Sequence, residues 1–221
     1  MKDYYSRQIM LWGEEAQKSL SDKSILIVGS GGLGCSVALA LSGVGLGEID
    51  IVDFDRVEIH NIHRQILFDT KDIGRLKAEV VSNKIARRDN NLKSKSYTMP
   101  FNEFIKESPR YDLIIDATDN LETREEIDNY AKELNIAWIY GSVEEFNGQV
   151  CLFKDSSFSI FNKKDVKQKG ISAPMVMQVA SFEANLALRF LLNLPIKSDI
   201  LHYLYYNSEG DFEIKKFKLG D

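Results

Sequence analysis

The chain has 221 residues, of which 28 are basic and 33 acidic, giving a net charge of −5 and a pI near 5.4. A hydrophobic content of 44% supports a substantial core and excludes a disordered chain. Two cysteines, Cys35 and Cys151, are too few for a disulfide scaffold, and the acidic balance argues against a nucleic-acid groove. The uncharged stretch 37–47 is too short and glycine-rich to span a bilayer, and residues 1–5 lack the apolar core of a signal peptide. We therefore expect a cytoplasmic protein that binds neither membranes nor nucleic acid.

Strands and helices alternate along the first 141 residues. Short β-branched apolar runs indicate buried strands, and apolar residues at helical spacing indicate amphipathic helices. In chain order we expect strand 24–28, helix 34–43, strand 48–54, helix 76–88, strand 94–99, strand 112–116, helix 122–134 and strand 137–141. Nearly all-apolar strands separated by helices are typical of a parallel sheet covered on both faces.

The pattern changes after residue 141. There we expect strands 148–153 and 157–161, a helix over 172–193, and a terminal hairpin of strands 199–206 and 212–217. Ser172 is the predicted N-cap of that helix, with Pro174 in its first turn. The predicted fold class is α/β: a Rossmann-like parallel sheet that continues into a mixed sheet with antiparallel C-terminal strands. We treat residues 1–221 as one domain with a nucleotide-binding half, 1–141, and a second half, 142–221.

A glycine-rich segment joins the first strand to the first helix of this sheet. Gly29, Gly31 and Gly34 have the Gly-x-Gly-x-x-Gly spacing, which lets a backbone turn present N–H groups to a phosphate at a helix N-terminus. Asp53 ends the next strand, where a carboxylate can accept hydrogen bonds from ribose hydroxyls. The pattern predicts a bound nucleotide, although a tight turn without a ligand has the same glycines. Taken alone, these residues favour an NAD-dependent dehydrogenase.

The residues that follow indicate a triphosphate instead. The polar loop 53–65 contains Arg64, and Lys77 begins the next helix. A leaving pyrophosphate needs such cations, because negative charge accumulates on its oxygens in the transition state. Asp119 follows the strand 112–116 at the carboxyl edge of the sheet, where it can bind Mg²⁺ beside phosphates. The alternatives are that both cations are solvated surface residues and that Asp119 is an N-cap.

Six motifs occur in the order and spacing of the ThiF/MoeB/HesA family, the bacterial relatives of ubiquitin-activating enzymes. They are Tyr5-Ser6-Arg7-Gln8, the glycine loop 29–34, Asp53-Phe54-Asp55, Asn61-x-x-Arg64-Gln65, Gly74-x-x-Lys77 and Ala117-Thr118-Asp119-Asn120. The likeness continues through Gly170-Ile171-Ser172-Ala173-Pro174. The whole chain therefore resembles this family of adenylyltransferases.

This resemblance implies ATP-dependent adenylation of the C-terminal glycine of a ubiquitin-like sulfur carrier ending in Gly-Gly. The carrier would be ThiS- or MoaD-like and would serve thiamine or molybdopterin-type biosynthesis. The resemblance also implies a homodimer in which residues 142–221 bind the carrier and the second subunit. It assigns nucleotide binding to Gly29, Gly31, Gly32, Gly34, Asp53, Asp55, Asn61, Arg64, Gln65 and Lys77. It assigns catalysis to Arg7, Arg64, Lys77 and Asp119, with Asp119 as the Mg²⁺ ligand and Arg7 acting in the neighbouring subunit's site.

The chain departs from the family pattern at its cysteines. Many relatives carry two Cys-x-x-Cys pairs for a structural zinc, which Cys35 and Cys151 cannot build, so we expect no zinc. Both are interpreted as buried structural cysteines. Some relatives carry a cysteine in the loop that matches residues 161–170, but this loop has four lysines and no cysteine. We expect the enzyme to stop at the adenylate and a separate sulfur donor to follow. The lysines can steer an acidic carrier or simply be solvated.

Two other functions remain open at this point. An NAD(P)-dependent oxidoreductase with a Rossmann fold would have the same glycine loop, but the sequence lacks an obvious Tyr-x-x-x-Lys pair. A non-catalytic nucleotide-binding subunit of a heterodimeric activating enzyme would also fit, although Arg64, Lys77 and Asp119 argue against an inert site. Four aromatic residues of the second half are interpreted as core or carrier-binding surface: Phe146, Tyr203, Tyr205 and Tyr206.

Overall fold

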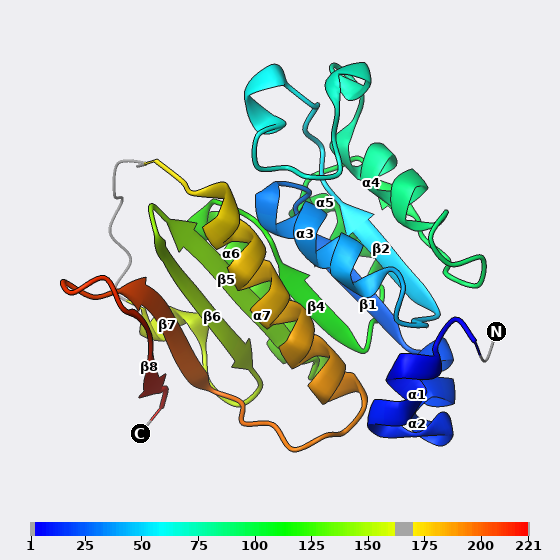
Figure 1. The fold of residues 1–221 in the computed structure, drawn as a ribbon. Coiled ribbons are helices and arrows are strands. Elements are labelled where there is room, and N and C mark those ends of the chain that lie inside the picture. The colour runs from blue at the N-terminus through cyan, green and yellow to red at the C-terminus, as the bar shows by residue number, and fades with distance from the viewer. Residues whose placement is uncertain (1–2, 162–169, 221) are drawn as a thin grey trace.

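A computed structural model describes residues 3–161 and 170–220. Its centre is an eight-stranded sheet with the order β3-β2-β1-β4-β5-β6-β7-β8 (Figure 1). The strands are β1 (Ser24–Val28), β2 (Glu48–Val52), β3 (Ser96–Tyr97), β4 (Leu113–Asp116), β5 (Trp138–Glu144), β6 (Asn147–Phe153), β7 (Ile200–Tyr206) and β8 (Phe212–Lys218). The α-helices are α1 (Ser6–Trp12), α2 (Glu14–Ser19), α3 (Gly32–Leu41), α4 (Lys77–Ile85), α5 (Phe101–Phe104), α6 (Leu121–Leu134) and α7 (Ala173–Leu191).

The sheet changes from parallel to antiparallel at β5. Strands β1 to β5 pair in parallel, whereas β5–β6, β6–β7 and β7–β8 pair antiparallel. Val28 pairs with Val52 and with Asp116, so the parallel strands end together at one carboxyl edge. The predicted fold class is confirmed, including the terminal hairpin.

Helices cover both faces of the sheet, as the all-apolar strands predict. Side chains alternate along β1, so Ile25 and Ile27 lie in the core beneath α3, α4 and α7, while Leu26 and Val28 lie in the core with α5 and α6. Helices α3 and α7 lie side by side across one face (Figure 1). The packing brings the first turn of α7 against the glycine loop, where Val176 would contact a side chain at Gly32.

Helices α1 and α2 pack at the opposite edge, where the parallel strands begin (Figure 1). Gln8 Nε2 donates to the Gly43 carbonyl at 3.2 Å, and Gln17 Nε2 donates to the Val44 carbonyl at 2.8 Å. Both carbonyls belong to the loop that leads into β2. Helices α1 and α2 are therefore fixed at the amino edge of the sheet.

The expected strand 157–161 is wrong. The segment contains the 3₁₀ helix η5 (Phe158–Ile160), which begins where the Ser157 hydroxyl accepts a hydrogen bond from the Ser159 N–H at 3.1 Å. Phe158 is buried against Trp138 and Phe153. The aromatic residues that suggested a strand are thus core residues of a short turn.

Other expected elements are present with shorter bounds. Helix 76–88 is confirmed as Lys77–Ile85, strand 94–99 is reduced to Ser96–Tyr97, and helix 172–193 is confirmed as Ala173–Leu191. Ser172 occupies the predicted N-cap position, but its side chain makes no capping hydrogen bond. Within residues 3–161 and 170–220, none of the helices is both long enough and apolar enough to cross a membrane.

Candidate nucleotide-binding site

The glycine loop between β1 and α3 is a tight turn that only glycine can make at two positions. Gly29 has a φ of +95°, and a Cβ there would lie 2.6 Å from the Ala117 carbonyl oxygen. A Cβ at Gly34 would lie 2.0 Å from the Gly29 oxygen. A Cβ at Gly31, by contrast, would have only the Gln65 amide nitrogen within 4 Å, at a distance of 3.9 Å. The turn thus brings the N-terminus of α3 to the carboxyl edge of the sheet.

Asp53 holds the glycine loop and the next loop together. Its Oδ2 accepts a hydrogen bond from the Ser30 N–H at 2.6 Å, and its Oδ1 accepts one from the Asp55 N–H at 2.7 Å. Burial raises the pKa of this carboxyl, and the two backbone donors oppose that shift. The predicted ribose acceptor is therefore already fixed, with lone pairs left on each oxygen for a ligand.

Lys77 is buried, so it is not an ordinary solvated cation. Its Nζ lies 2.8 Å from Asp55 Oδ2, and its own N–H donates to the Asp55 carbonyl at 2.9 Å. The Lys77 side chain is 9% exposed, whereas that of Asp55 is 55% exposed. The ammonium is thus held at the start of α4, with a partner carboxylate on its solvent side.

The polar loop after β2 contains both structural and exposed residues. Asn61 is buried, and its Oδ1 accepts a hydrogen bond from the Glu58 N–H at 3.0 Å, which closes the loop. Gln65 is also buried, and its Oε1 has no hydrogen-bond partner among the described residues. Arg64 is half-buried, with one guanidinium nitrogen 3.1 Å from the His60 carbonyl. Gln65 and Arg64 therefore keep donors and acceptors for a ligand beside the glycine loop.

Asp119 carries an exposed carboxylate just after β4. It makes no hydrogen bond or ion pair with the part of the chain that the structure describes. The alternative that Asp119 caps the following helix is wrong, because Asn120 Oδ1 accepts from the Thr123 N–H at 2.8 Å and is the N-cap of α6. The Asp119 side chain is therefore left for a ligand.

These residues fit a nucleotide-bound magnesium ion better than an all-protein metal site. Within residues 3–161 and 170–220, no three His, Cys, Asp or Glu side chains gather as metal ligands. Asp55 is paired with Lys77, and Asp116 is fully buried against Arg124, so neither matches the free carboxylate of Asp119. Mg²⁺ commonly takes one or two carboxylates and completes its shell with phosphate oxygens and water. A single free aspartate is compatible with that arrangement.

A buried ion pair behind Asp119 was not predicted from the sequence. Arg124 Nε lies 3.0 Å from Asp116 Oδ2, and both residues are buried. The signal that can reveal it is helical spacing: Arg124 shares the buried face of α6 with Ile127 and Ala131. An arginine on the apolar face of a helix indicates a buried partner.

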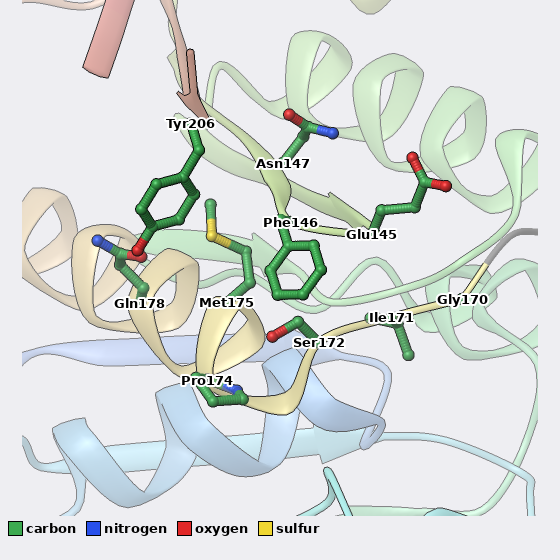
Figure 2. A pocket seen from close by; sticks show the side chains of 10 residues that line it. All are labelled: Glu145, Phe146, Asn147, Gly170, Ile171, Ser172, Pro174, Met175, Gln178 and Tyr206. Carbon is green, nitrogen blue, oxygen red and sulfur yellow. The ribbon is translucent and has the colours of Figure 1, made fainter. Parts of the chain in front are cut away.

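A pocket adjoins the first turn of α7, the turn that contacts the glycine loop at Gly32 (Figure 2). It has a volume of about 930 Å³ and lies between the β5–β6 turn, the first turns of α7 and the end of β7. Phe146 in the turn is 63% exposed, and Tyr206 and Met175 line the opposite side. The arrangement provides apolar surface next to the place expected for the phosphates.

Arg7 does not reach this site within one chain. It belongs to α1, which packs at the amino edge of the sheet through Gln8 and the Gly43 carbonyl. The strand β1 separates that edge from the glycine loop by roughly 13 Å, at about 3.3 Å per residue. Arg7 therefore lies apart from Arg64 and Lys77 within one chain.

Both cysteines are buried, as predicted. Burial raises the pKa of Cys35 to about 12 and raises the pKa of Cys151 as well. A thiol with a raised pKa is a poor nucleophile at neutral pH. The four lysines of the loop 161–170 lie at positions 163, 164, 167 and 169, outside the described residues.

A parallel sheet with a glycine loop, a fixed acid after β2 and cations near its carboxyl edge is typical of α/β proteins that bind nucleotides. The sequence pattern of the ThiF family matches residues 5–221, so the chain belongs to the ThiF family. The predicted family is confirmed.

Curated relatives carry adenylyltransferase names. The chain is 37% identical over 155 residues to the sulfur carrier protein adenylyltransferase of Thermus thermophilus, covering 68% of this chain and 57% of that protein. It is 32% identical over 204 residues to the sulfur carrier protein ThiS adenylyltransferase of Escherichia coli, covering 85% and 80%. It spans only 38% of the adenylyltransferase and sulfurtransferase MOCS3 of Caenorhabditis briggsae.

Solved structures confirm the fold. Escherichia coli MccB with ATP superposes with a TM-score of 0.87 at 20% identity, covering 98% of this chain and 71% of that one. The same protein with a MccA peptide variant superposes with a TM-score of 0.86 and covers 100% of this chain. At this identity the likeness describes the architecture alone.

Proposed function

We propose that this protein uses ATP and Mg²⁺ to adenylate the C-terminal glycine of a ubiquitin-like sulfur carrier that ends in Gly-Gly. The carrier would belong to thiamine or molybdopterin-type biosynthesis, in line with the names of the relatives. One observation carries the proposal. The glycine loop, with Arg64 against it, shares the carboxyl edge of the sheet with the buried cation Lys77 and the free carboxylate of Asp119.

The chemistry needs position and charge rather than a protein nucleophile. A carboxylate oxygen of the carrier attacks the α-phosphorus of ATP, the bond to the bridging oxygen breaks, and its electron pair leaves with pyrophosphate. The backbone N–H groups of the glycine loop and the N-terminus of α3 stabilise the phosphates. Lys77 and Arg64 offset the charge that develops on the leaving oxygens, and each such donor contributes about 10²- to 10³-fold in rate.

Three further groups complete the assignment. Asp53 accepts hydrogen bonds from the ribose, because lone pairs remain on its oxygens. Asp119 binds Mg²⁺, which neutralises phosphate charge when present. Asn61 keeps the polar loop closed over the site through Glu58.

The acceptor enters through the pocket of Figure 2. A flexible chain ending in Gly-Gly can pass between Phe146 and Tyr206 to reach the phosphates, because the pocket adjoins the first turn of α7 and that turn contacts Gly32. Neither buried cysteine is suited to a covalent link with the carrier. A separate sulfur donor therefore converts the adenylate to the thiocarboxylate.

A homodimer places Arg7 in the partner's site. The support is the position of α1 at the amino edge, together with the exposure of Met10 and Leu11, at 77% and 76%, on the same helix. Exposed apolar side chains on a short helix are typical of a surface that a partner covers.

One assay separates this function from its alternatives: exchange of labelled pyrophosphate into ATP, with and without a small carrier ending in Gly-Gly. Exchange that depends on the carrier supports the proposal. A nicotinamide-linked absorbance change with a hydroxy or carbonyl substrate, and no exchange, would instead support an oxidoreductase. The absence of both pyrophosphate exchange and an absorbance change would indicate a non-catalytic subunit.

A further inference from the structure

The backbone of Thr118, the residue before Asp119, is held from two sides. Asp116 Oδ1 accepts hydrogen bonds from the Thr118 N–H at 2.9 Å and from its hydroxyl at 2.6 Å. One terminal nitrogen of Arg124 donates to the Thr118 carbonyl at 2.7 Å. Asn120, the residue after Asp119, is fixed as the cap of α6. The free carboxylate of Asp119 thus projects from a segment that is fixed on both sides.

The same arginine joins this segment to the rest of the site. A terminal nitrogen of Arg124 also donates to the Gly141 carbonyl on β5 at 3.3 Å, and its guanidinium lies 5.1 Å from the centre of the Tyr140 ring. On the other side, Gly29 packs directly on the Ala117 carbonyl. The Asp119 segment, the glycine loop and the end of β5 are therefore packed as one unit.

The guanidinium of Arg124 can hold several segments together in one fixed geometry, which a lysine ammonium cannot do. It presents several donors in a fixed plane, and Arg124 uses them on three acceptors, two at the end of β4 and one on β5. A buried ion pair adds little net stability compared with an apolar replacement, yet removing one partner leaves an unpaired charge. The pair Asp116–Arg124 has 0% and 9% of its side-chain surface exposed. We therefore attribute the role of this ion pair to the geometry that it fixes rather than to the stability that it adds.

We infer that Arg124 is a positioning residue that, together with Asp116, aims the carboxylate of Asp119 at the metal-bound nucleotide. It touches neither metal nor phosphate itself and acts through the Thr118 backbone. The inference rests on the proposed function, since it assumes that Asp119 meets a magnesium–nucleotide complex.

The test is calorimetric titration of the purified protein with ATP, once with excess Mg²⁺ and once with EDTA. For the wild-type chain we expect Mg²⁺ to tighten ATP binding, and for Asp119→Asn we expect that gain to disappear. Arg124→Lys keeps the charge but loses the planar donors. We expect this variant to lose most of the increase in ATP affinity that Mg²⁺ gives, since a misplaced group costs about ten- to a hundredfold. Its affinity for metal-free ATP should stay within about twofold of wild type.

The matched control is Lys132→Gln on the same helix, which breaks the 2.8 Å ion pair with Asp128 far from the site. We expect it to keep the full gain from Mg²⁺. An Arg124→Lys protein that also keeps the full gain would overturn the inference while leaving the proposed function intact. A wild-type protein that binds no ATP would overturn both.

A second variant covers the case in which Arg124→Lys does not fold. Thr118→Val removes only the hydroxyl bonded to Asp116 and keeps the shape of the side chain. We expect faster amide exchange at residues 117–120 and a partial loss of the gain from Mg²⁺. Unchanged exchange together with an unchanged gain would contradict the positioning role.

Discussion

The carboxyl edge of the parallel strands and the hairpin β7–β8 differ in how they treat polar and apolar groups. At the carboxyl edge, the charged groups Asp116, Arg124 and Lys77 are buried and bonded. On the hairpin, Phe212, Ile214 and Phe217 of β8 are all exposed, with lysines between them. The hairpin forms the far border of the sheet (Figure 1).

This difference indicates that the carboxyl edge and the hairpin have different functions. Reacting groups must be held in place before substrate arrives, and the candidate site accordingly uses buried bonds that fix Lys77 and the segment beside Asp119. Recognition of a protein partner needs exposed surface instead, and an edge strand guarded by lysines is protected from random pairing. We therefore expect changes at the carboxyl edge of the parallel strands to affect chemistry, and changes to exposed residues of the second half, such as Phe146, to affect the acceptor alone.

The largest expected effect is that of Lys77→Ala. Its ammonium is fixed at the start of α4, so its loss should reduce pyrophosphate exchange by about 10²- to 10³-fold. The fold should persist, because the Asp55 carboxylate left behind is 55% exposed and can be solvated. Lys71→Ala, an exposed cation of the same loop, is the control and should retain its exchange rate. Equal rates for the two variants would show that the edge is not the reaction site.

Arg7→Ala tests whether the site is completed by a second copy. Arg7 lies at the amino edge, so the variant should fold normally, as measured by circular dichroism, and lose exchange. Mixing Arg7→Ala with Asp119→Ala chains should restore about a quarter of the wild-type rate, because half of the dimers are mixed and each has one intact site. If mixing restores nothing while the single Arg7→Ala chain is inactive, the partner does not supply this arginine.

Phe146→Ala should separate acceptor recognition from nucleotide binding. The side chain is 63% exposed in the pocket beside the glycine loop. Truncating an exposed aromatic anchor should raise the KM for the carrier about tenfold, while ATP affinity stays the same. Ile160→Ala in η5 (Phe158–Ile160) is the control, because this side chain is 51% exposed and does not line the pocket. An unchanged KM for the carrier would move the acceptor path elsewhere.

The last prediction concerns stability rather than activity and involves Glu183 of α7, which is fully buried against Gly141. Burial, with Asp116 nearby, raises its pKa well above 4.5, although Arg124 opposes the shift. The folded state therefore keeps a proton that the unfolded chain releases above pH 4.5. Below pH 4.5 both states hold the proton, so Glu183 does not lower the free energy of unfolding there. Between pH 4.5 and the raised pKa, the free energy of unfolding falls by at most about 1.4 kcal/mol per pH unit.

Glu183→Gln should remove this pH dependence. In urea unfolding, the variant should gain stability relative to wild type between pH 5 and pH 8, whereas Glu133→Gln on the exposed side of α6 should follow wild type. A constant difference between Glu183→Gln and wild type across that range would show that Glu183 ionises normally in the folded protein.

Sequence patterns were sufficient where one local rule decides the structure. The glycine spacing predicted the turn at Gly29 and Gly34, and the apolar runs predicted the parallel strands, because each depends only on neighbours in the chain. The segment 157–161 was misassigned because aromatic residues suit both a strand and a buried turn.

The sequence patterns did not predict which side chains far apart in the chain contact one another. Lys77 meets Asp55, and Arg124 meets Asp116 and Gly141, only after β2, β4 and β5 align at one edge. The position of Arg7 at the opposite edge likewise depends on where α1 packs. The candidate residues thus stay a prediction from sequence motifs, whereas their burial, partners and separation came only from the structure.

Calorimetric titration of the unliganded chain with magnesium-ATP and, separately, with NAD⁺ tests the identity of the bound nucleotide most directly. We predict saturable binding of magnesium-ATP that Lys77→Ala weakens, and no heat of binding with NAD⁺. Saturable binding of NAD⁺ by a protein that takes up no ATP would contradict the account.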